Sequence, residues 1–497
     1  MRAEGQGSVS RALYEELRAR IGDGTLPSGA ALPSTRGLAA ERGLSRTTVS
    51  LVYEQLAADG FIETRPGAAS QVARSLRQGA VHGAQPAATP GPTTPGDAPL
   101  RRTSRGGARL AGLQLPAATP PHPSEIDFVY GPLARRDFPA AAWLKAQRAV
   151  VQRGPVRLAY GDPMGDPTLR QALQAHLARS RGMACAVEQL MIVNGSQQAL
   201  DLCARVLLDP GDVVVVEQPG YRMAHHVFEQ AGAVLAPVAV DAQGLQTDHL
   251  AQVAQAQALY VTPTHQFPLG GFLPMGRRLA LLAWAQARGA WVIEDDYDGE
   301  YRHGVRPEPS LRALDAQDGV VYIGTFSKTL SPELRLGYLL LPRALVQPFA
   351  MAKRLADRHT ATVPQRALAQ LLADGSYDHH LRRMRRQQRA RQQALLVSLA
   401  RALGAQVQVQ GAASGLHVVV WFPGLPADQE MVLVEAAADE RVRVYPVGRF
   451  DVPGHTAPGR PAGLVMGYAL LEREQIEEGV SRLAAAYRRL RQPATPA

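Results

Sequence analysis

One lysine in this chain stands where a predicted strand ends. Lysine occurs only at Lys145, Lys328 and Lys353. Lys145 and Lys353 fall in amphipathic stretches and are predicted to be exposed helix positions, whereas Lys328 closely follows the apolar run at residues 320–323. An amine at the end of a buried strand is a candidate for covalent attachment to a carbonyl cofactor. A surface lysine in a loop is the simpler interpretation, and position alone does not decide between the two.

Residues at the other predicted strand ends favour a cofactor. Pyridoxal phosphate (PLP) needs a lysine for its aldehyde, an anion for its pyridine nitrogen, phosphate donors and an aromatic ring beside its own. Asp295 and Tyr297 follow the strand predicted at residues 290–293 and could serve the ring nitrogen and the 3-oxygen. Tyr221 follows another apolar run and could stack on the ring. The phosphate candidates begin a predicted helix or flank Lys328: Gly195, Ser196, Gln197, Ser327 and Arg335.

Each of these signals has an alternative when it is taken alone. Two aspartates after a strand often form a metal or capping site, and the segment ending at Tyr221 can be only a turn. The combination with Lys328 is much harder to obtain by chance, so it carries the argument. The two cysteines, Cys185 and Cys203, form no metal-ligand pattern and suit a reducing compartment, and no metal is expected.

The elements that must position these residues alternate along residues 125–493. Apolar runs end in polar clusters, and helical spacers lie between some of them. This alternation predicts an α/β fold with a doubly wound, mainly parallel sheet whose site lies at the carboxyl ends of the strands. The last hundred or so residues change character and predict a smaller α+β subdomain beside the large one.

Residues 8–74 predict a winged helix-turn-helix. Apolar stripes indicate helices at residues 10–21, at residues 34–41 and from Ser45 to about Gly60, followed by a short hairpin. The helix that starts at Ser45 would be the recognition helix of a DNA-binding domain. A small helical domain with solvated arginines is the alternative. The predicted DNA-binding residues are Arg36, Ser45, Arg46, Thr47, Thr48, Ser50, Arg65 and Gly67.

Between these two regions, residues 75–124 lose periodicity and fill with Pro, Ala, Gly and Thr, which predicts a linker. The net charge of +10 hints at a polyanionic partner, but residues 1–74 hold nine Arg against eight Asp or Glu. The net positive charge therefore does not prove DNA binding, and the evidence for it must come from the local sequence pattern. No apolar run long enough to span a membrane and no signal-peptide core occur, so a cytoplasmic protein is expected.

Two resemblances cover most of the chain. The stretch from about Leu13 to Val72, including LPSTRGLAAERGLSRTTVSLVYEQLAADGFIETRPG, resembles the GntR-type winged helix. The segments GSQQALDL, EQPGY, TPTHQFPLG, EDDYDGEYR and GTFSKTLSPELRLGY resemble the fold-type I aminotransferase module of MocR-type regulators, bacterial transcription factors that join the two parts in this order. The second resemblance implies a homodimer that binds PLP near its interface.

The resemblance also implies a role for individual residues. Lys328 matches the Schiff-base lysine, Asp295 the partner of the pyridine nitrogen and Tyr297 the residue beside the 3-oxygen. The other matched positions are Tyr221 for ring stacking, His265 or Gln266 where aminotransferases keep an asparagine, Ser196, Gln197, Ser327 and Arg335 for the phosphate, and Tyr160 for a phosphate contact across the dimer interface.

Three departures from the family pattern affect this interpretation. The predicted wing, GAASQV, lacks the usual second glycine and threonine, and Glu333 replaces a glycine at an expected loop surface. Val465 occupies the position of the arginine that grips a substrate α-carboxylate, and valine cannot form that bidentate pair. Arg443 or Arg449 could substitute, although the sequence does not place either of them.

Three hypotheses follow. The chain is a regulator whose head binds promoter DNA and whose body binds PLP and senses PLP itself or an amine or amino acid. Alternatively, it is a PLP-dependent aminotransferase with an incidental head, which Val465 argues against. A cofactor-free interaction scaffold is the third hypothesis, and the intact set of Lys328, Asp295 and Tyr221 argues against it.

Overall fold

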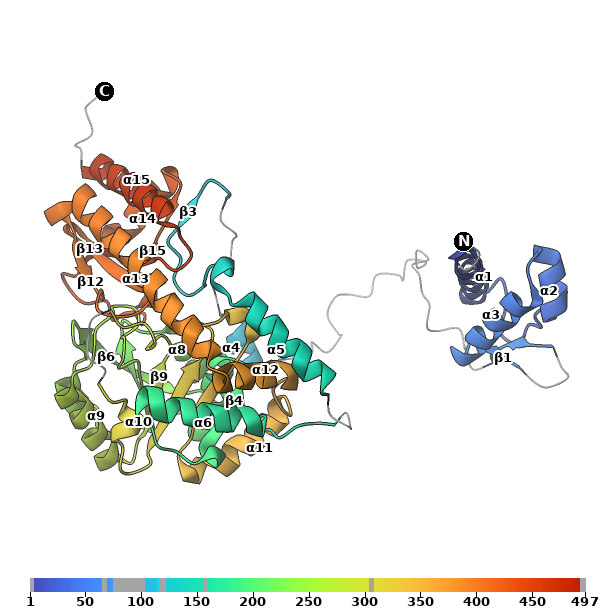
Figure 1. Cartoon of the computed structure of the whole chain (residues 1–497), viewed down its shortest axis with the longest axis horizontal. Helices are drawn as coiled ribbons and strands as arrows, with labels where there is room; N and C mark the ends of the chain where they lie inside the picture. The colour runs from blue at the N-terminus through green and yellow to red at the C-terminus, as the bar shows by residue number, and fades with distance from the viewer. Residues whose placement is uncertain are drawn as a thin grey trace, which may run out of the picture. The chain divides into compact units, whose positions relative to one another are not determined.

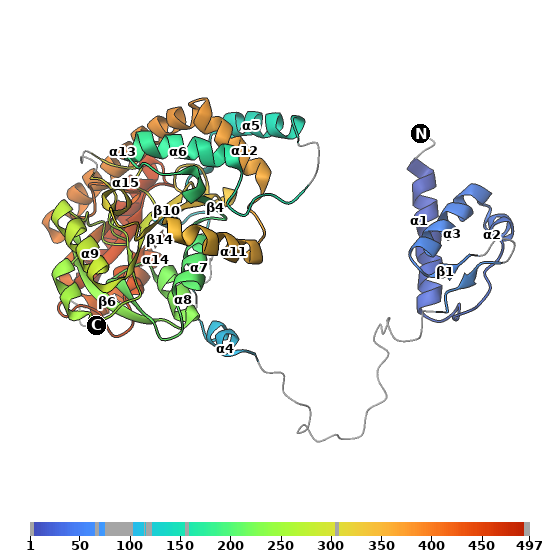
Figure 2. The same cartoon turned by 90° about the horizontal axis from the view of Figure 1, so that it is seen from below.

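The computed structural model describes residues 4–64, 69–74, 103–113, 115, 122–154, 159–303 and 308–491. The chain divides into two compact units, Met1–Arg102 and Thr103–Ala497, and each is described by itself. Figures 1 and 2 show the small helical head in blue and the larger body in the remaining colours.

The head is a three-helix domain with a two-stranded wing. Ser34 and Ser45 accept hydrogen bonds from the backbone N–H groups of Gly37 and Thr48, and these caps start the second and third helices. Gly43, at a φ of 64°, ends the second helix, as expected. The elements are α1 (Glu4–Gly22), α2 (Thr35–Arg42), α3 (Arg46–Ala58), β1 (Ile62–Glu63) and β2 (Gln71–Val72). The winged helix-turn-helix is therefore confirmed, with α1 beginning earlier than its apolar stripe predicts.

The body is built on one eight-stranded sheet. Its strand order is β4-β11-β10-β9-β8-β5-β6-β7. The strands β10, β9, β8, β5 and β6 run parallel, whereas β11 and β7 are antiparallel to their neighbours. The bounds are β4 (Leu190–Val193), β5 (Val213–Gln218), β6 (Val234–Asp241), β7 (Gly244–Leu245), β8 (Ala258–Val261), β9 (Trp291–Asp296), β10 (Val320–Thr325) and β11 (Gly337–Leu340).

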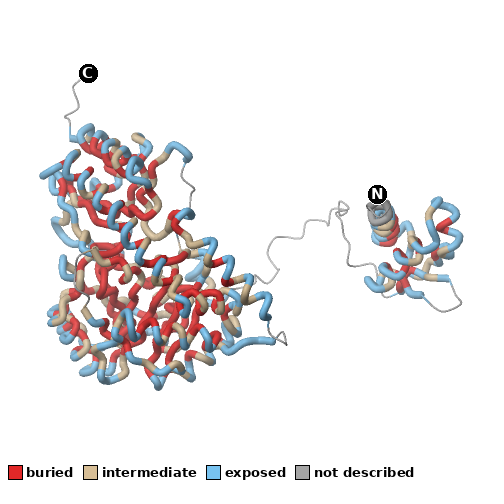
Figure 3. Tube along the Cα trace, in the orientation of Figure 1, coloured by how far each residue is buried: buried red, intermediate tan, exposed pale blue. Residues whose placement is uncertain are grey.

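Helices and buried apolar clusters cover the sheet. One cluster joins Leu200 and Phe228 to strand residues such as Ile293, and a separate cluster joins Leu281 to Val292. Consecutive strand residues thus belong to different cores, as in a sheet covered on two faces, and Figure 3 shows the buried interior in red. The helices are α5 (Ala140–Gln152), α6 (Pro167–Arg181), α7 (Ser196–Leu207), α8 (Arg222–Ala231), α9 (Met275–Arg288), α10 (Leu311–Leu314), α11 (Val346–Ala356) and α12 (Thr362–Ala373).

The C-terminal part of the body forms the smaller α+β subdomain that the sequence predicts. A long helix leads into a four-stranded sheet of order β12-β13-β16-β15, and a two-residue strand near the start of the body pairs in parallel with β14. The bounds are α13 (Ser376–Ala402), β12 (Gln408–Gln410), β13 (His417–Pro426), α14 (Glu430–Asp439), β14 (Val442–Arg443), β15 (Tyr445–Pro446), β16 (Pro461–Gly467), α15 (Arg473–Arg491) and β3 (Ile126–Asp127). The α/β class is confirmed.

Within the described part of the range predicted as linker lies one short helix, α4 (Arg105–Ala111). Ser104 caps it by accepting a hydrogen bond from the Gly107 N–H, and Arg109 donates to the carbonyl of Gln230 at 2.8 Å. A local cap and contacts with α8, this hydrogen bond among them, thus order a segment that shows no helical periodicity of apolar residues. In the described part of the chain, no helix is both long and apolar enough to cross a membrane.

Candidate cofactor site and DNA-binding helix

Lys328 lies just beyond the carboxyl end of β10. That strand pairs in parallel with β9, and Ile323 stands opposite Asp295. The half-buried Lys328 Nζ donates a hydrogen bond to the carbonyl of Gly131 at 3.0 Å. Burial lowers the pKa of the Lys328 amine, while the negative charges of Asp298 and Asp295 oppose that shift. A lowered pKa leaves more of the amine neutral, which is the nucleophilic form.

Asp295 is a buried carboxylate, and one of its two oxygens has no hydrogen-bond partner among the described residues. The hydroxyl of Tyr260 donates to its Oδ2 at 2.8 Å, whereas Oδ1 has no hydrogen-bond partner among the described residues. Burial raises the pKa of Asp295 to about 7, and Lys328 works in the opposite direction. An unsatisfied buried acceptor is costly, so a protonated ring nitrogen would fit this oxygen by supplying both a donor and a positive charge. The site therefore fits PLP.

His265 and Gln266, the two candidates for the place where aminotransferases keep an asparagine, have different surroundings in the structure. His265 Nδ1 lies 2.9 Å from the hydroxyl of Tyr297, so His265 belongs to the site. Gln266 instead braces its own loop: its Nε2 donates to the Pro219 carbonyl at 3.0 Å, and its Oε1 accepts from the Leu269 N–H. Sequence reasoning could not choose between them, because neighbouring residues in a loop point in different directions.

The start of α7 forms a cradle for an anion. Gly195 has a φ of 82°, and a Cβ at this position would stand 2.7 Å from the guanidinium of Arg335. Arg335 donates to the Asn194 carbonyl at 2.8 Å, which holds its positive charge beside the helix N-terminus. Gly337 packs against Gly195 and pairs with Thr325, next to the loop that carries Ser327. The helix start itself supplies Ser196 and Gln197.

Lys353 is not exposed, and the prediction that it would be is wrong. Its side chain is fully buried, and its Nζ donates to both carboxylate oxygens of Asp357 at 2.8 Å. Asp357 also accepts from Asn194 and Gln198, at 2.6 and 2.7 Å. The amphipathic pattern of α11 gave no sign that a lysine on its inner face meets an acidic partner one turn later. This network braces the start of α7 behind the anion cradle.

An apolar and aromatic wall surrounds Val465, the residue predicted to replace the carboxylate arginine. Val465 is fully buried in β16 between Tyr445 and Val419. Tyr221 meets Phe267 edge-on at 5.6 Å within the same cluster. The wall consists of Tyr130, Tyr221, Phe267, Leu269, Tyr297, Val419, Trp421, Tyr445, Val447, Phe450 and Val465.

Of the two arginines considered as substitutes, Arg443 is paired elsewhere and Arg449 lies exposed beside the wall. Arg443 forms an ion pair with Glu125 at 2.9 Å. Arg449 is exposed, and its guanidinium lies 5.9 Å from the centre of the Tyr445 ring. Glu333 is exposed on a short 3-10 turn, as expected. Tyr160 is 74% exposed, and the guanidinium of Arg358 lies 4.4 Å from the centre of its ring, so Tyr160 is accessible at the surface of the body.

In the head, α3 presents part of the predicted DNA-binding set. Arg46 and Thr47 are exposed on its first turn, Ser50 is half-buried, and Arg36 is exposed on α2. The hydroxyls of Ser45 and Thr48 lie 2.8 Å apart in the helix cap, so they serve α3 itself. The predicted wing residues Arg65 and Gly67 lie outside the described residues.

The structure adds one residue to this face. Leu51 is 57% exposed on α3, one residue after Ser50. The sequence prediction included only polar residues of this helix and so omitted Leu51, although an apolar side chain can contact the methyl group of thymine. The sequence signal for this residue is an apolar side chain directly after Ser50 on the predicted recognition helix.

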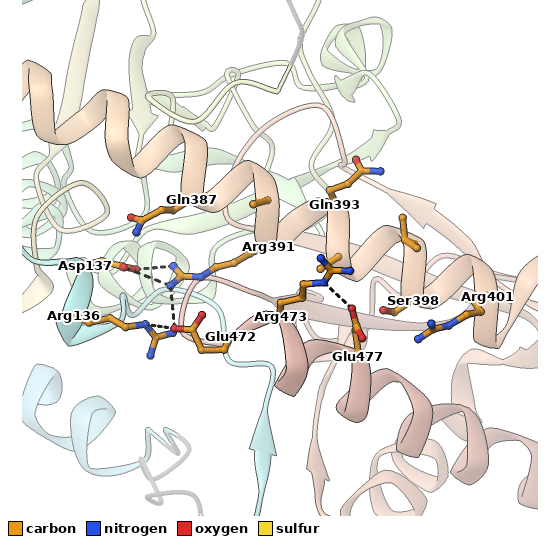
Figure 4. A pocket seen from close by; sticks show the side chains of 13 residues that line it. Arg136, Asp137, Gln387, Arg391, Gln393, Ser398, Arg401, Glu472, Arg473 and Glu477 are labelled. Carbon is orange, nitrogen blue, oxygen red and sulfur yellow. Dashed lines mark hydrogen bonds and ion pairs between the residues drawn. The ribbon is translucent and has the colours of Figure 1, made fainter.

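A hollow elsewhere on the body is not part of this site. It has a volume of about 610 Å³ and lies along α13 and the start of α15 (Figure 4). Arg391 pairs there with Asp137 at 2.6 Å, and Arg473 pairs with Glu477 at 2.8 Å. None of the predicted cofactor residues lines it, and its charges largely neutralise one another.

Comparison with known proteins agrees with this division of the chain. Residues 132–483 match the family model of aminotransferase class I and II, and residues 9–72 match that of bacterial regulatory proteins of the gntR family. The probable rhizopine catabolism regulatory protein MocR of Rhizobium meliloti is 34% identical over 96% of this chain and 94% of its own length. The pyridoxine biosynthesis transcriptional regulator PdxR of Corynebacterium glutamicum is 31% identical over 83% of each chain.

Among solved structures, the α-aminoadipate aminotransferase LysN of Thermus thermophilus is similar, with 34% identity and a TM-score of 0.66 over 74% of this chain and 93% of that one. The fold and the site thus define a class: a winged helix-turn-helix joined to a fold-type I aminotransferase-like body. Within this class, the chain belongs to the MocR-type transcriptional regulators of the GntR family.

Proposed function

We propose that this protein is a transcriptional regulator that holds PLP through a covalent bond to Lys328 and senses PLP or an amine effector. The observation that carries the proposal is the free Oδ1 of buried Asp295, beside an amine whose pKa is lowered. When bound, PLP supplies an electrophilic carbon that captures amines. Asp295 would hold the ring nitrogen, Tyr221 the ring face and Tyr297 the 3-oxygen.

The phosphate would lie at the start of α7. Ser196, Gln197 and Ser327 offer donors there, and Arg335 offers charge. We propose a homodimer in which the exposed Tyr160 reaches the partner's phosphate, because a large accessible aromatic beside an arginine suits an interface. The proposed division is a head at residues 8–74, a linker at 75–124 that includes α4, and a body at 125–493, in a cytoplasmic protein.

The wall around Val465 supports a sensor over an enzyme. An α-carboxylate placed against buried Val465 would lose its hydration without gaining an ion pair, which is costly. Val465 therefore favours PLP itself or an amine without an α-carboxylate as the effector. The name of one relative, a pyridoxine biosynthesis transcriptional regulator, fits PLP itself as the effector.

The second candidate function is a PLP-dependent aminotransferase with an incidental head. It is favoured by the 2-aminoadipate transaminase of Thermus thermophilus, which is 35% identical over 74% of this chain and 91% of its own length. The two functions differ in turnover. Incubation of the full chain with amino donors and a keto acid should yield no sustained keto product for a sensor, whereas many turnovers per site would favour the enzyme.

The DNA-binding half of the proposal predicts a loss of affinity in Arg46→Ala. If this exposed side chain at the start of α3 contacts a base, its removal costs about 1–3 kcal/mol of binding free energy and relaxes specificity at that base pair. Titration of labelled promoter DNA with the full chain measures the loss. Arg11→Ala is the control, because Arg11 is exposed on α1 and pairs with Glu15. Equal affinities for Arg46→Ala and wild type would remove Arg46 from the recognition set.

A further inference from the structure

A buried histidine stands behind the tyrosine of the candidate cofactor site. His265 is 1% exposed, and its Nδ1 lies 2.9 Å from the Tyr297 hydroxyl and 3.0 Å from Asp298 Oδ2. Two glycines leave room for the ring. A Cβ at Gly415 would overlap the imidazole, and one at Gly270 would stand 3.0 Å from Nε2. The surrounding chain is therefore shaped around His265 in this position.

The two contacts at Nδ1 fix the direction of the hydrogen bonds. Nδ1 carries either one hydrogen or one lone pair, and the carboxylate oxygens of Asp298 accept hydrogen bonds. Nδ1 must then carry the hydrogen, which it shares between Asp298 and the phenol oxygen of Tyr297. Tyr297 cannot donate to an N–H group, so its own hydroxyl hydrogen is free to point elsewhere. The His265 Nε2 has no partner in the described part of the chain.

The titratable groups that face His265 come from several elements. They are Tyr297 and Asp298 just after β9, His303 and, on β13, His417; Asp295 acts on Tyr297, and Lys328 acts on His417. His417 donates from Nε2 to the Pro268 carbonyl at 2.9 Å, and burial lowers its pKa to about 4, so it stays neutral. Burial, with the charge of Asp298, raises the pKa of Tyr297, which keeps Tyr297 a phenol that can donate.

We propose that His265 is a positioning residue: held by Asp298, it presents its Nδ1–H to the phenol oxygen of Tyr297 and turns the Tyr297 hydroxyl hydrogen toward the 3-oxygen of PLP. This inference rests on the proposed function and extends it to Asp298, which no comparison assigns a role. Donation to the 3-oxygen draws negative charge away from it. The neighbouring nitrogen on Lys328 then holds its proton less tightly, and the His265–Asp298 pair tunes that affinity.

The test is a pH titration of the visible absorbance of PLP bound to the full chain. His265→Ala should raise the apparent pKa of this absorbance change by about one unit, because the 3-oxygen keeps more of its charge. His265→Asn should restore most of the wild-type value, since an amide N–H can replace the imidazole donor. Tyr297→Phe should raise the pKa as well, and adding His265→Ala to it should cause no further shift.

Several results would overturn the inference. One is an unchanged titration in His265→Ala with PLP bound, and another is the same shift in the Tyr297→Phe background. If His265→Ala fails to fold, nitrogen NMR of the wild-type chain decides, because a His265 protonated at Nε2 and bare at Nδ1 contradicts the inference. Tight stoichiometric binding of Zn²⁺ that His417→Ala abolishes would also contradict it, since these side chains would then be metal ligands. The amount of PLP per chain is measured first: a wild-type chain without PLP overturns the proposed function itself.

Discussion

Lys328→Ala incubated with PLP is expected to lose the visible absorbance of a PLP–lysine bond and to take up no covalent label on borohydride reduction, whereas the wild-type chain should show both. Alanine removes the only amine that stands at the carboxyl end of β10, so no covalent bond to the protein can form. The anion cradle and Asp295 remain, and PLP would bind the variant only reversibly. Absorbance spectra, with mass spectrometry after borohydride reduction, measure the covalent fraction.

Lys145→Ala is the matched control, because Lys145 is exposed on α5 and should leave colour and labelling unchanged. A Lys328→Ala chain that remained yellow and labelled would place the covalent bond elsewhere. The buried Lys353 would then be the first alternative, because of the two remaining lysines it is the one that contacts α7.

Asp295→Asn is expected to weaken PLP binding by about 3–5 kcal/mol, the usual cost of removing one partner of a buried charge pair. Asparagine keeps the volume and can still accept a hydrogen bond from the Tyr260 hydroxyl. It cannot balance a positive ring nitrogen, so the loss reports charge rather than shape. Equilibrium dialysis of PLP against the apoprotein measures the affinity, and a loss below tenfold would contradict the role of Asp295.

The same carboxylate predicts a pH dependence of stability in the apoprotein. Its folded pKa is raised from 3.8 to about 7, so the folded state holds its proton more tightly than the unfolded state does. The stability of the apoprotein should therefore fall as the pH rises from about 4 to about 7. The Asp295→Asn apoprotein should lose less stability over this window, although Glu217 and Glu294, with pKa values also raised to about 7, keep part of the slope.

PLP should cancel the Asp295 part of this effect in the wild-type chain, because a charged ring nitrogen favours the ionised carboxylate. Melting temperatures at several pH values, with and without PLP, measure both the pH dependence of the apoprotein and its change on PLP binding. An increase in wild-type melting temperature on PLP binding that does not grow between pH 5 and 7 would contradict them.

The sequence predicts the large elements of this fold well because their signals are local. The apolar run at 320–323 and the caps at Ser34 and Ser45 each depend on a few adjacent residues, and the structure confirms them. Prediction from the sequence fails where the structure of a segment depends on a partner that is distant along the chain. The burial of Lys353 depends on contacts with α7, and α4 depends on a contact 121 residues away.

The candidate site shows the same division. Strand-end positions bring Lys328 and Asp295 together from pattern alone, because neighbouring parallel strands end at one edge of the sheet. The pattern could not show that Asp295 has a free oxygen, that Gln266 turns away, or that Asp298 holds His265. These facts depend on side-chain directions within loops, for which sequence spacing gives no rule.

The proposed regulation requires that PLP at Lys328 carries a signal to the head. The most direct measurement is the affinity of the full chain for its promoter DNA, titrated with and without PLP, in wild type and in Lys328→Ala. We expect PLP to change the wild-type affinity by about 5- to 150-fold, the usual range of coupling between two sites, and to leave Lys328→Ala unchanged. If the wild-type chain is saturated with PLP and its affinity for the promoter DNA is still unchanged, that result would contradict this regulation.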